Sequence, residues 1–397
     1  MKLGNENLQK RPIKTLAFVY YYLPFFSIAL IGLIASIYLS VSHYRVHSDP
    51  TYSSFCAVSR ALNCDTVSSS PYAVFLNMPL AVWGVLGYML VLALLVLAGS
   101  HWARKKRFWP ILFWITLIYS TGSLILAGIS SLLIHSYCIV CILTYLVNFL
   151  LLYYSWFVNR RFGTGGLFKG FVEDIQFLWT KNKISIPAFV GFILIIVGLI
   201  AIMPGYWHLK PSTLDGSVPR GITEDGYPWI GAENPTLTIN IFSDYMCFQC
   251  KKMHFFLRQM VAQHPEKIRL IHRHFPMDRQ YNPLVTDDYH SGAGKMAMIA
   301  LYAQAKGQFW KVNDLLFDVA SKKQDFNTRT FAAFMDAEKA EIVAALDHKP
   351  FRLRLKHDIA VGIDQGITGT PGFIIDGTVH LGTIPEGVLK KMISEND

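Results

Sequence analysis

Charged residues are scarce in this chain: of its 397 residues only 16% are Asp, Glu, Lys or Arg, whereas 52% are hydrophobic. Typical soluble domains carry about 25% charged residues, and disordered chains are poor in apolar ones. The composition therefore excludes a disordered protein and a highly charged nucleic-acid binder. Cysteine is scarce as well, because six residues are far fewer than a disulfide-rich scaffold would contain. The positions of these cysteines therefore matter more than their number.

Patterns that would indicate a bound nucleotide or metal are also missing. The chain contains neither GxGxxG nor a P-loop. Two CxxC pairs occur, but a zinc site needs them about 15 to 20 residues apart, and more than a hundred residues separate Cys141 from Cys247. We therefore expect no metal. His254, His272 and His274 lack the spacing of ligands, and we expect His254 to be a surface or supporting residue.

Long uncharged stretches are present instead, and a bilayer-spanning helix needs about 20 apolar residues. The first stretch lies between Thr15 and Tyr44. A cleaved signal peptide would have an apolar core of about 7 to 15 residues followed by small residues. We therefore expect a retained helix, with Tyr20, Tyr21 and Tyr22 at the membrane interface. Four further spans are predicted at about residues 80–98, 111–134, 139–158 and 184–203.

The basic residues orient these five spans, because cytoplasmic loops collect Lys and Arg. All basic clusters fall on one side, which places the N-terminus in the cytoplasm and everything after Met203 on the exported side. This pattern accounts for the net charge of +10 and predicts a lipid bilayer, not a nucleic acid, as the partner. The clusters are Lys2, Lys10, Arg11 and Lys14; Arg104, Lys105, Lys106 and Arg107; and Arg160, Arg161, Lys169, Lys181 and Lys183.

The C-terminal cysteines follow a predicted strand. Residues 236–242 alternate between apolar and polar side chains, and Cys247 and Cys250 come directly before a helical run at 251–262. At a helix N-terminus the macrodipole favours a thiolate. We therefore expect Cys247 to be the attacking cysteine and Cys250 to be the resolving one.

Thr370 and Pro371 lie far downstream, before a strand-like segment at residues 373–375. A CxxC at a helix start together with such a proline resembles the thioredoxin superfamily, and the length resembles its DsbA-type branch. The resemblance implies a cis peptide at Pro371 beside the cysteines. Helical patterning over 297–316 and 331–346 indicates an inserted helical subdomain. The alternative is a permanent disulfide, but such a short loop is strained and a poor cross-link.

The remaining cysteines lie at the exported edge of the predicted membrane, where disulfides persist. The pattern consists of Cys56 and Cys64 in the loop after the first span, Ser70 six residues later, and Cys138 and Cys141 at the start of the fourth span with Thr144 and Tyr145 just inside. Across residues 15–158 this pattern resembles the vitamin K epoxide reductase family. Bacterial members of that family are often fused to a thioredoxin-like domain, and this chain has the same order.

The resemblance also implies roles for individual residues. Cys141 is the thiolate nearest a quinone, and Cys138 accepts electrons from the loop pair. Tyr145 and Ser70 donate hydrogen bonds to a quinone oxygen or to a redox cysteine, since a polar donor at a lipid-facing site is costly unless it is used. Two alternatives stay open: Tyr145 is an interior hydroxyl bonded to a neighbouring helix, and Asn77 caps the second span instead of binding quinone.

The predicted fold is an α-helical membrane bundle followed by an α/β thioredoxin-like domain with a helical insertion. Residues 1–160 form a four-helix core that resembles the reductase family. Residues 161–221 hold a basic cytoplasmic loop, a fifth transmembrane helix and an exported linker. Residues 222–397 form the thioredoxin-like domain.

The predicted function is a quinone-dependent protein dithiol oxidase of a bacterial inner membrane. Electrons pass from exported proteins with reduced cysteines to a quinone such as ubiquinone or menaquinone, and each thiol step is an exchange through a mixed disulfide. Three alternatives remain. A disulfide isomerase or reductase would need a cytosolic electron donor, although no cysteine faces the cytoplasm. The others are an enzyme that reduces vitamin K epoxide itself and a membrane-tethered, thiol-binding chaperone.

Overall fold

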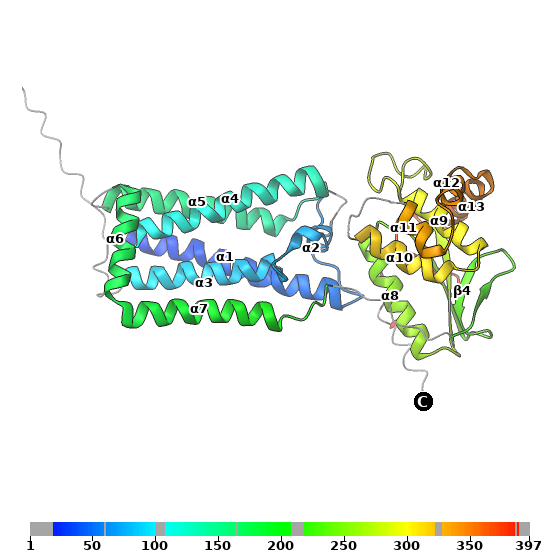
Figure 1. Ribbon diagram of the computed structural model, residues 1–397, viewed down its shortest axis with the longest axis horizontal. Coiled ribbons are helices and arrows are strands. Elements are labelled where there is room, and N and C mark those ends of the chain that lie inside the picture. Colours follow the sequence, from blue (N-terminus) through cyan, green and yellow to red (C-terminus); the bar gives the residue numbers. More distant parts are fainter. Residues whose placement is uncertain are drawn as a thin grey trace, which may run out of the picture. The chain divides into compact units, whose positions relative to one another are not determined.

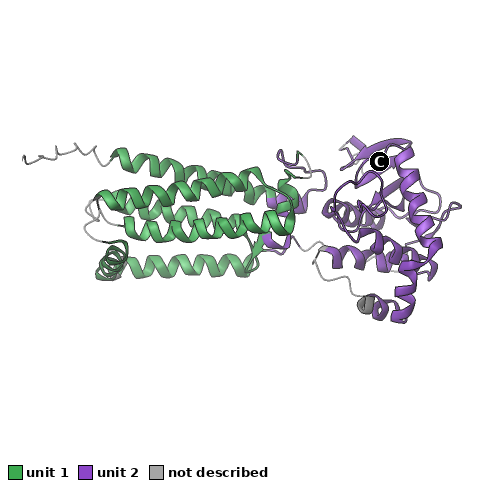
Figure 2. Ribbon diagram, turned by 90° about the horizontal axis from the view of Figure 1, so that it is seen from above, with its two compact units in different colours: residues 1–42, 58–67, 73–203 green, residues 43–57, 68–72, 204–397 purple. Residues whose placement is uncertain are grey.

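The computed structural model describes residues 19–58, 61–99, 108–162, 166–207, 218–321, 328–385 and 387–388. The chain forms two compact units, which Figure 2 shows in different colours. The first consists of Met1–Ser42, Val58–Val67 and Ala73–Met203, and the second of His43–Ala57, Ser68–Tyr72 and Pro204–Asp397.

Five helices in the described part of the chain are long and apolar enough to cross a membrane, so the five predicted spans are confirmed (Figure 1). A π-helical turn, Ser130–Ile134, extends the third of them. The basic clusters 2–14 and 104–107 lie outside the described residues. The helices are α1 (Val19–Ser48), α3 (Leu80–Gly99), α4 (Trp109–Ile129), α5 (Ile139–Phe162) and α7 (Asn182–Ile202).

Close packing holds the membrane helices together. Phe25 of α1 meets Trp109 of α4 edge-on, with ring centroids 5.3 Å apart, and Leu151 of α5 is fully buried. Gly32 allows α1 to approach Tyr88 of α3, because a Cβ there would lie 2.4 Å from the tyrosine ring. Such contacts matter in a bilayer, where lipid tails are as apolar as the side chains and only good packing favours helix association.

The segment between α5 and α7 differs from the predicted basic loop, because it contains helix α6 (Leu167–Thr180). This helix packs against α4, where the rings of Phe171 and Trp114 are 6.2 Å apart. The buried carboxylate of Asp174 accepts the N–H of Phe108, the residue before α4, at 3.1 Å. It thereby satisfies a backbone donor at a helix start and complements the helix dipole.

The C-terminal domain has a six-stranded mixed sheet with the order β3-β4-β6-β5-β7-β8. Strands β5 and β6 are parallel and are connected by helix α8 (Phe248–Gln263), while the other neighbouring strands are antiparallel. This β-α-β unit with a following hairpin confirms the predicted thioredoxin-like fold. The strands are β3 (Arg220–Ile222), β4 (Pro228–Gly231), β5 (Leu237–Ser243), β6 (Ile268–His274), β7 (Gly372–Ile375) and β8 (Thr378–Leu381).

The predicted helical insertion lies between β6 and β7. Each of the two predicted helical stretches is divided into two helices, because Gly307 and Asp336 adopt positive φ angles of 72° and 52° that end a right-handed helix. The helices are α9 (Ala293–Ala305), α10 (Phe309–Ser321), α11 (Thr328–Met335), α12 (Lys339–Asp347) and α13 (Lys349–Asp364).

Gly231, at the end of β4, is required by its surroundings. Its φ is +117°, and a Cβ would lie 2.0 Å from the carbonyl oxygen of Ile268. Gly231→Ala is expected to lower the free energy of unfolding by about 2 to 4 kcal/mol, through backbone strain and overpacking. Urea unfolding of the full chain in detergent measures this loss. Gly307→Ala is the matched control, since no atom lies within 4 Å of its Cβ position; equal losses in both variants would contradict the steric argument.

Candidate active site

The C-terminal CxxC lies where β5 leads into α8. Strand β5 ends at Ser243, and Cys247 takes the N-cap position of α8 after a short turn. The Cys247 sulfur accepts the N–H of Cys250 at 3.3 Å, and its thiol donates to the carbonyl oxygen of Thr370 at 3.5 Å. The peptide bond between Thr370 and Pro371 is cis. The structure thus brings the loop of Thr370 and Pro371 against the first cysteine of the pair.

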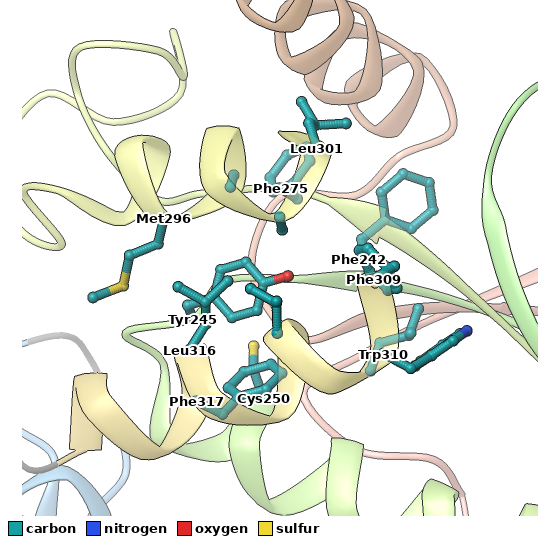
Figure 3. Packing of buried hydrophobic residues seen from close by; sticks show 14 of the residues in the cluster. Phe242, Tyr245, Cys250, Phe275, Met296, Leu301, Phe309, Trp310, Leu316 and Phe317 are labelled. Carbon is teal, nitrogen blue, oxygen red and sulfur yellow. The ribbon is translucent and has the colours of Figure 1, made fainter. Parts of the chain in front are cut away.

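The two sulfurs of this pair have different surroundings. A hydrogen bond from the Cys250 thiol lowers the pKa of Cys247, and His290 lowers it further, although burial and Asp244 oppose this shift. Burial raises the pKa of Cys250 well above that of an ordinary thiol, and its hydrogen bond to Cys247 adds to the effect. Figure 3 shows Cys250 close to Tyr245 and to the aromatic side chains of the core. Cys247 is therefore suited to attack and Cys250 to resolve.

Asp244 and His290 lie beside this pair, and no sequence pattern indicated either residue. Asp244 is 1% exposed and belongs to the turn before Cys247. Its Oδ1 accepts the N–H of Met246 at 2.7 Å, and its Oδ2 accepts the N–H of Met277 at 2.6 Å. Nδ1 of His290 lies 2.9 Å from the same Oδ2. The two residues are 46 positions apart, so no local motif could have indicated the contact.

Three other histidines lie in the core of this domain. Of the two alternatives expected for His254, the surface position was wrong, because its side chain is fully buried, with Nε2 2.7 Å from Oδ1 of Asp314. His272 and His274, on β6, have ring centroids 4.9 Å apart. Burial lowers the pKa of His274 to about 3. Within the described residues, no group of three or more His, Cys, Asp or Glu side chains is arranged to hold a metal ion.

The loop cysteines differ from the other four in their redox state. Cys56 and Cys64 are disulfide-bonded, whereas the two CxxC pairs carry free thiols. Cys64 is the first residue of the short helix α2 (Cys64–Ser68). Asn63 caps this helix, since its Oδ1 accepts the N–H groups of Asp65 and Thr66 at 3.0 Å each.

A short bridge joins the loop to the start of α5. Tyr137 donates its N–H to the carbonyl oxygen of Ala61 at 2.7 Å, and its own carbonyl oxygen accepts the N–H of Asn63 at 3.0 Å. Because Asn63 directly precedes Cys64 and Tyr137 directly precedes Cys138, the bridge brings the chain segments of these two cysteines side by side. No sequence motif indicated Asn63, because an asparagine before a cysteine is not a recognised pattern.

The membrane CxxC opens α5. The Cys138 sulfur accepts the N–H of Cys141 at 3.2 Å. Thr144 donates its hydroxyl to the carbonyl oxygen of Cys141 at 2.7 Å, so this hydroxyl is used within the helix. Tyr145 is half-buried and lies about one turn beyond Cys141, on nearly the same helical face.

Ser70 and Asn77 lie between α2 and α3. Ser70 is half-buried in a bend. Asn77 is exposed in the two-residue turn between β1 (Val74–Phe75) and β2 (Met78–Pro79), where it and Leu76 have φ angles of 56° and 49°. Asparagine is favoured in such turns. The alternative that Asn77 caps the second span was therefore wrong, because β2 separates it from α3.

In the second unit, the segment that leads towards Cys56 packs against the start of α8. The two residues inside the CxxC, Phe248 and Gln249, both take part. The contacts are the His47 and Phe248 rings at 5.1 Å, Gln249 Nε2 to the Pro50 oxygen at 3.4 Å, and Lys252 Nζ to the oxygens of Asp49 and Tyr52 at 2.9 and 3.4 Å.

Comparison with known proteins found matches for both halves of the chain. Residues 23–156 match the vitamin K epoxide reductase family, and residues 223–395 match a thioredoxin family. Vitamin K epoxide reductase complex subunit 1 of Mus musculus is 32% identical over 136 residues, which cover 31% of this chain and 80% of that protein.

Several solved structures are also similar to this chain. DsbA2 of Pseudomonas aeruginosa is 21% identical, covering 43% of this chain and 93% of its own, with a TM-score of 0.33. The alpha-DsbA1 protein of Wolbachia pipientis is 17% identical, covering 44% and 92%, with a TM-score of 0.35. The catalytic domain of Proteus mirabilis ScsC is 20% identical, covering 43% and 88%, with a TM-score of 0.32.

Proposed function

This chain belongs to the vitamin K epoxide reductase family, and we propose that it oxidises the dithiols of exported proteins and passes their electrons to a membrane quinone. Its apolar helices and its two cysteine-bearing domains make it a membrane thiol-disulfide oxidoreductase. The direction of electron flow, the quinone and the bacterial inner membrane are the parts that we propose. The family is linked to vitamin K, which is itself a quinone.

The observation that carries the proposal is the backbone bridge between Tyr137 and residues 61–63. It holds the start of α2 beside the start of α5. Cys64 and Cys138 directly follow the two bridged residues, Asn63 and Tyr137. Thiol exchange requires one sulfur to approach another directly. The loop cysteines are disulfide-bonded and the CxxC at the start of α5 is reduced, so the two pairs can exchange electrons as successive members of a relay.

Electrons enter the relay at the C-terminal CxxC. A substrate thiolate attacks Cys247 of the oxidised pair, and the Cys250 thiolate leaves. A second substrate thiolate then attacks the substrate sulfur of the mixed disulfide and releases Cys247 as a thiolate. The substrate gains one disulfide and the pair gains two electrons, while two protons pass to solvent and to the thiols.

The loop pair carries these electrons to the membrane. Cys247 attacks Cys56, Cys64 leaves, and Cys250 then resolves the mixed disulfide. The contacts of Phe248, Gln249 and Lys252 with segment 47–52 support this step. Cys64 next attacks Cys138 of the oxidised membrane pair and Cys141 leaves, after which Cys56 attacks Cys64 and frees Cys138.

The donor set at the mouth of α5 fits a quinone. A bound quinone accepts two electrons and two protons. Cys141 lies in the first turn of α5, and Tyr145 lies about one turn further along nearly the same face. The phenol donates to an oxygen on which negative charge develops, and Ser70 is proposed as a second donor. The turn conformation at Asn77 already accounts for an asparagine at this position. Among the proposed quinone-binding residues, Asn77 therefore has the least support.

Quinone reduction by the purified chain, with a reduced protein as electron donor, tests the proposal. Alkylation trapping in cells distinguishes the alternatives. An oxidase keeps Cys247 and Cys250 oxidised, whereas an isomerase or reductase keeps them reduced, and a passive chaperone shows no dependence on quinone. Turnover of vitamin K epoxide without dithiol oxidation would instead favour an epoxide reductase.

The orientation of the chain is tested by reporter fusions. We expect a reporter that is active only outside the cytoplasm to give a signal when fused after Asp397 and none when fused after Arg107, because basic loops remain cytoplasmic. The opposite result would place all six cysteines at a reducing compartment and would contradict the proposed oxidase.

A further inference from the structure

We propose that Asp244 and His290 form a charge-compensating pair that stabilises the Cys247 thiolate, so that His290 sets the pH range in which this cysteine reacts. The proposal rests on the role of Cys247 as the attacking thiol. It assigns a positioning function to two residues outside the CxxC, one from the turn before α8 and one from the loop between β6 and α9.

The hydrogen bonds of the Asp244 side chain fix how His290 is held. Both oxygens of this side chain only accept hydrogen bonds, from two backbone N–H groups and from His290. Because Nδ1 of His290 donates to this carboxylate, the hydrogen-bond network assigns a proton to that nitrogen. The imidazole exchanges its second proton at Nε2, and the adjacent carboxylate favours the doubly protonated form.

A buried carboxylate next to a thiolate is unfavourable unless a positive charge offsets it. The backbone N–H of Cys247 donates to the backbone carbonyl oxygen of Asp244 at 3.2 Å, so the two residues share one tight turn. Asp244 raises the pKa of Cys247 and His290 lowers it. A protonated His290 therefore offsets the negative charge of the Asp244 carboxylate. It also attracts the Cys247 thiolate electrostatically.

Several charged groups on the neighbouring segments make contacts of their own. Asp278 accepts the N–H groups of Gly292 and Gly294 at 2.9 and 3.2 Å. Cys250 on α8 acts on Cys247 through the hydrogen bond described above, and the loop of Thr370 contributes a neutral carbonyl group. Two ion pairs lie on the same elements, Arg279 with Asp288 at 3.4 Å and Lys251 with Asp318 at 3.6 Å. The ring of Tyr289 stacks on His290 with centroids 4.0 Å apart.

The test measures alkylation of Cys247 against pH in the full, reduced chain in detergent, with iodoacetamide and peptide mass mapping. His290→Gln is expected to move the midpoint to higher pH by about one unit or more, since a nearby charge shifts a pKa by that amount. In the double variant Asp244→Asn with His290→Gln, the midpoint is expected to move back towards that of the natural chain. His357→Gln, at an exposed position on α13, is the matched control and leaves the midpoint unchanged.

An unchanged or lowered midpoint in His290→Gln would overturn the proposal, and so would a double variant that behaves like the single one. A second measurement needs no variant. Exchange of the imidazole C2 hydrogen followed by mass spectrometry gives the pKa of His290, which coupling predicts to be higher when Cys247 is a thiolate than when it is in a disulfide. Equal values would contradict the coupling. Neither measurement involves quinone. If the proposed electron transfer to quinone were wrong, the two measurements would still test the coupling of His290 to Cys247.

Discussion

Cys141→Ser is expected to abolish quinone reduction by the purified chain, because the hydroxyl of serine cannot accept electrons from Cys138 or pass them on. Exchange between the C-terminal CxxC and the loop pair is expected to continue, since it takes place outside the bilayer. Quinone absorbance follows the first reaction, and gel-shift alkylation follows the second. Quinone turnover that persists in Cys141→Ser would show that electrons leave the chain elsewhere.

Tyr145→Phe is the companion variant in this experiment. It removes one hydrogen-bond donor from an otherwise intact site, and loss of such a donor lowers the rate by about tenfold to a thousandfold. A variant with unchanged turnover and unchanged apparent quinone affinity but lower thermal stability would assign Tyr145 to packing. The two variants thus separate a residue that carries electrons from one that stabilises developing charge.

The membrane half could be predicted because its signal is contiguous. Each of the five spans is an apolar run long enough for the bilayer, and no distant residue can change that requirement. Helix α6 was missed because it is short and carries charges such as Lys169, Glu173 and Asp174, which resemble a polar loop. Its stability depends on packing against α4 and on the contact of Asp174 with Phe108, and neither is visible in the local sequence.

The two CxxC pairs could be identified because a CxxC at a helix start is itself a local pattern with a physical meaning. The residues that contact these cysteine segments could not be identified, because they come from distant parts of the sequence. The contact of Asp244 with His290 spans 46 positions, and the Asn63 to Tyr137 bridge joins a loop to a helix 74 residues later in the chain, as their numbers show. Only the folded backbone brings such residues together, so a single sequence contains no periodic or spacing signal for them.

Cys250→Ala is expected to trap the relay at its second step, with loss of net dithiol oxidation. Without Cys250, the disulfide between Cys247 and Cys56 has no resolving thiol on the C-terminal side and accumulates. The contacts of the CxxC residues with segment 47–52 favour Cys56 as the sulfur that is attacked. Non-reducing peptide mapping of the full chain identifies the trapped pair.

The matched control for this trap is Cys250→Ala combined with Cys56→Ser, in which the cross-link to the loop cannot form at Cys56. We expect the trapped species to disappear in this variant while Cys138 and Cys141 remain accessible to quinone. A cross-link from Cys247 to Cys138 in the single variant would contradict the proposed order, because electrons would then reach the membrane pair directly. A cross-link to Cys64 would still show that the loop pair carries electrons, but the two loop cysteines would exchange roles. Cys56 would then have to attack Cys138, and the backbone bridge beside Cys64 would have no role in electron transfer.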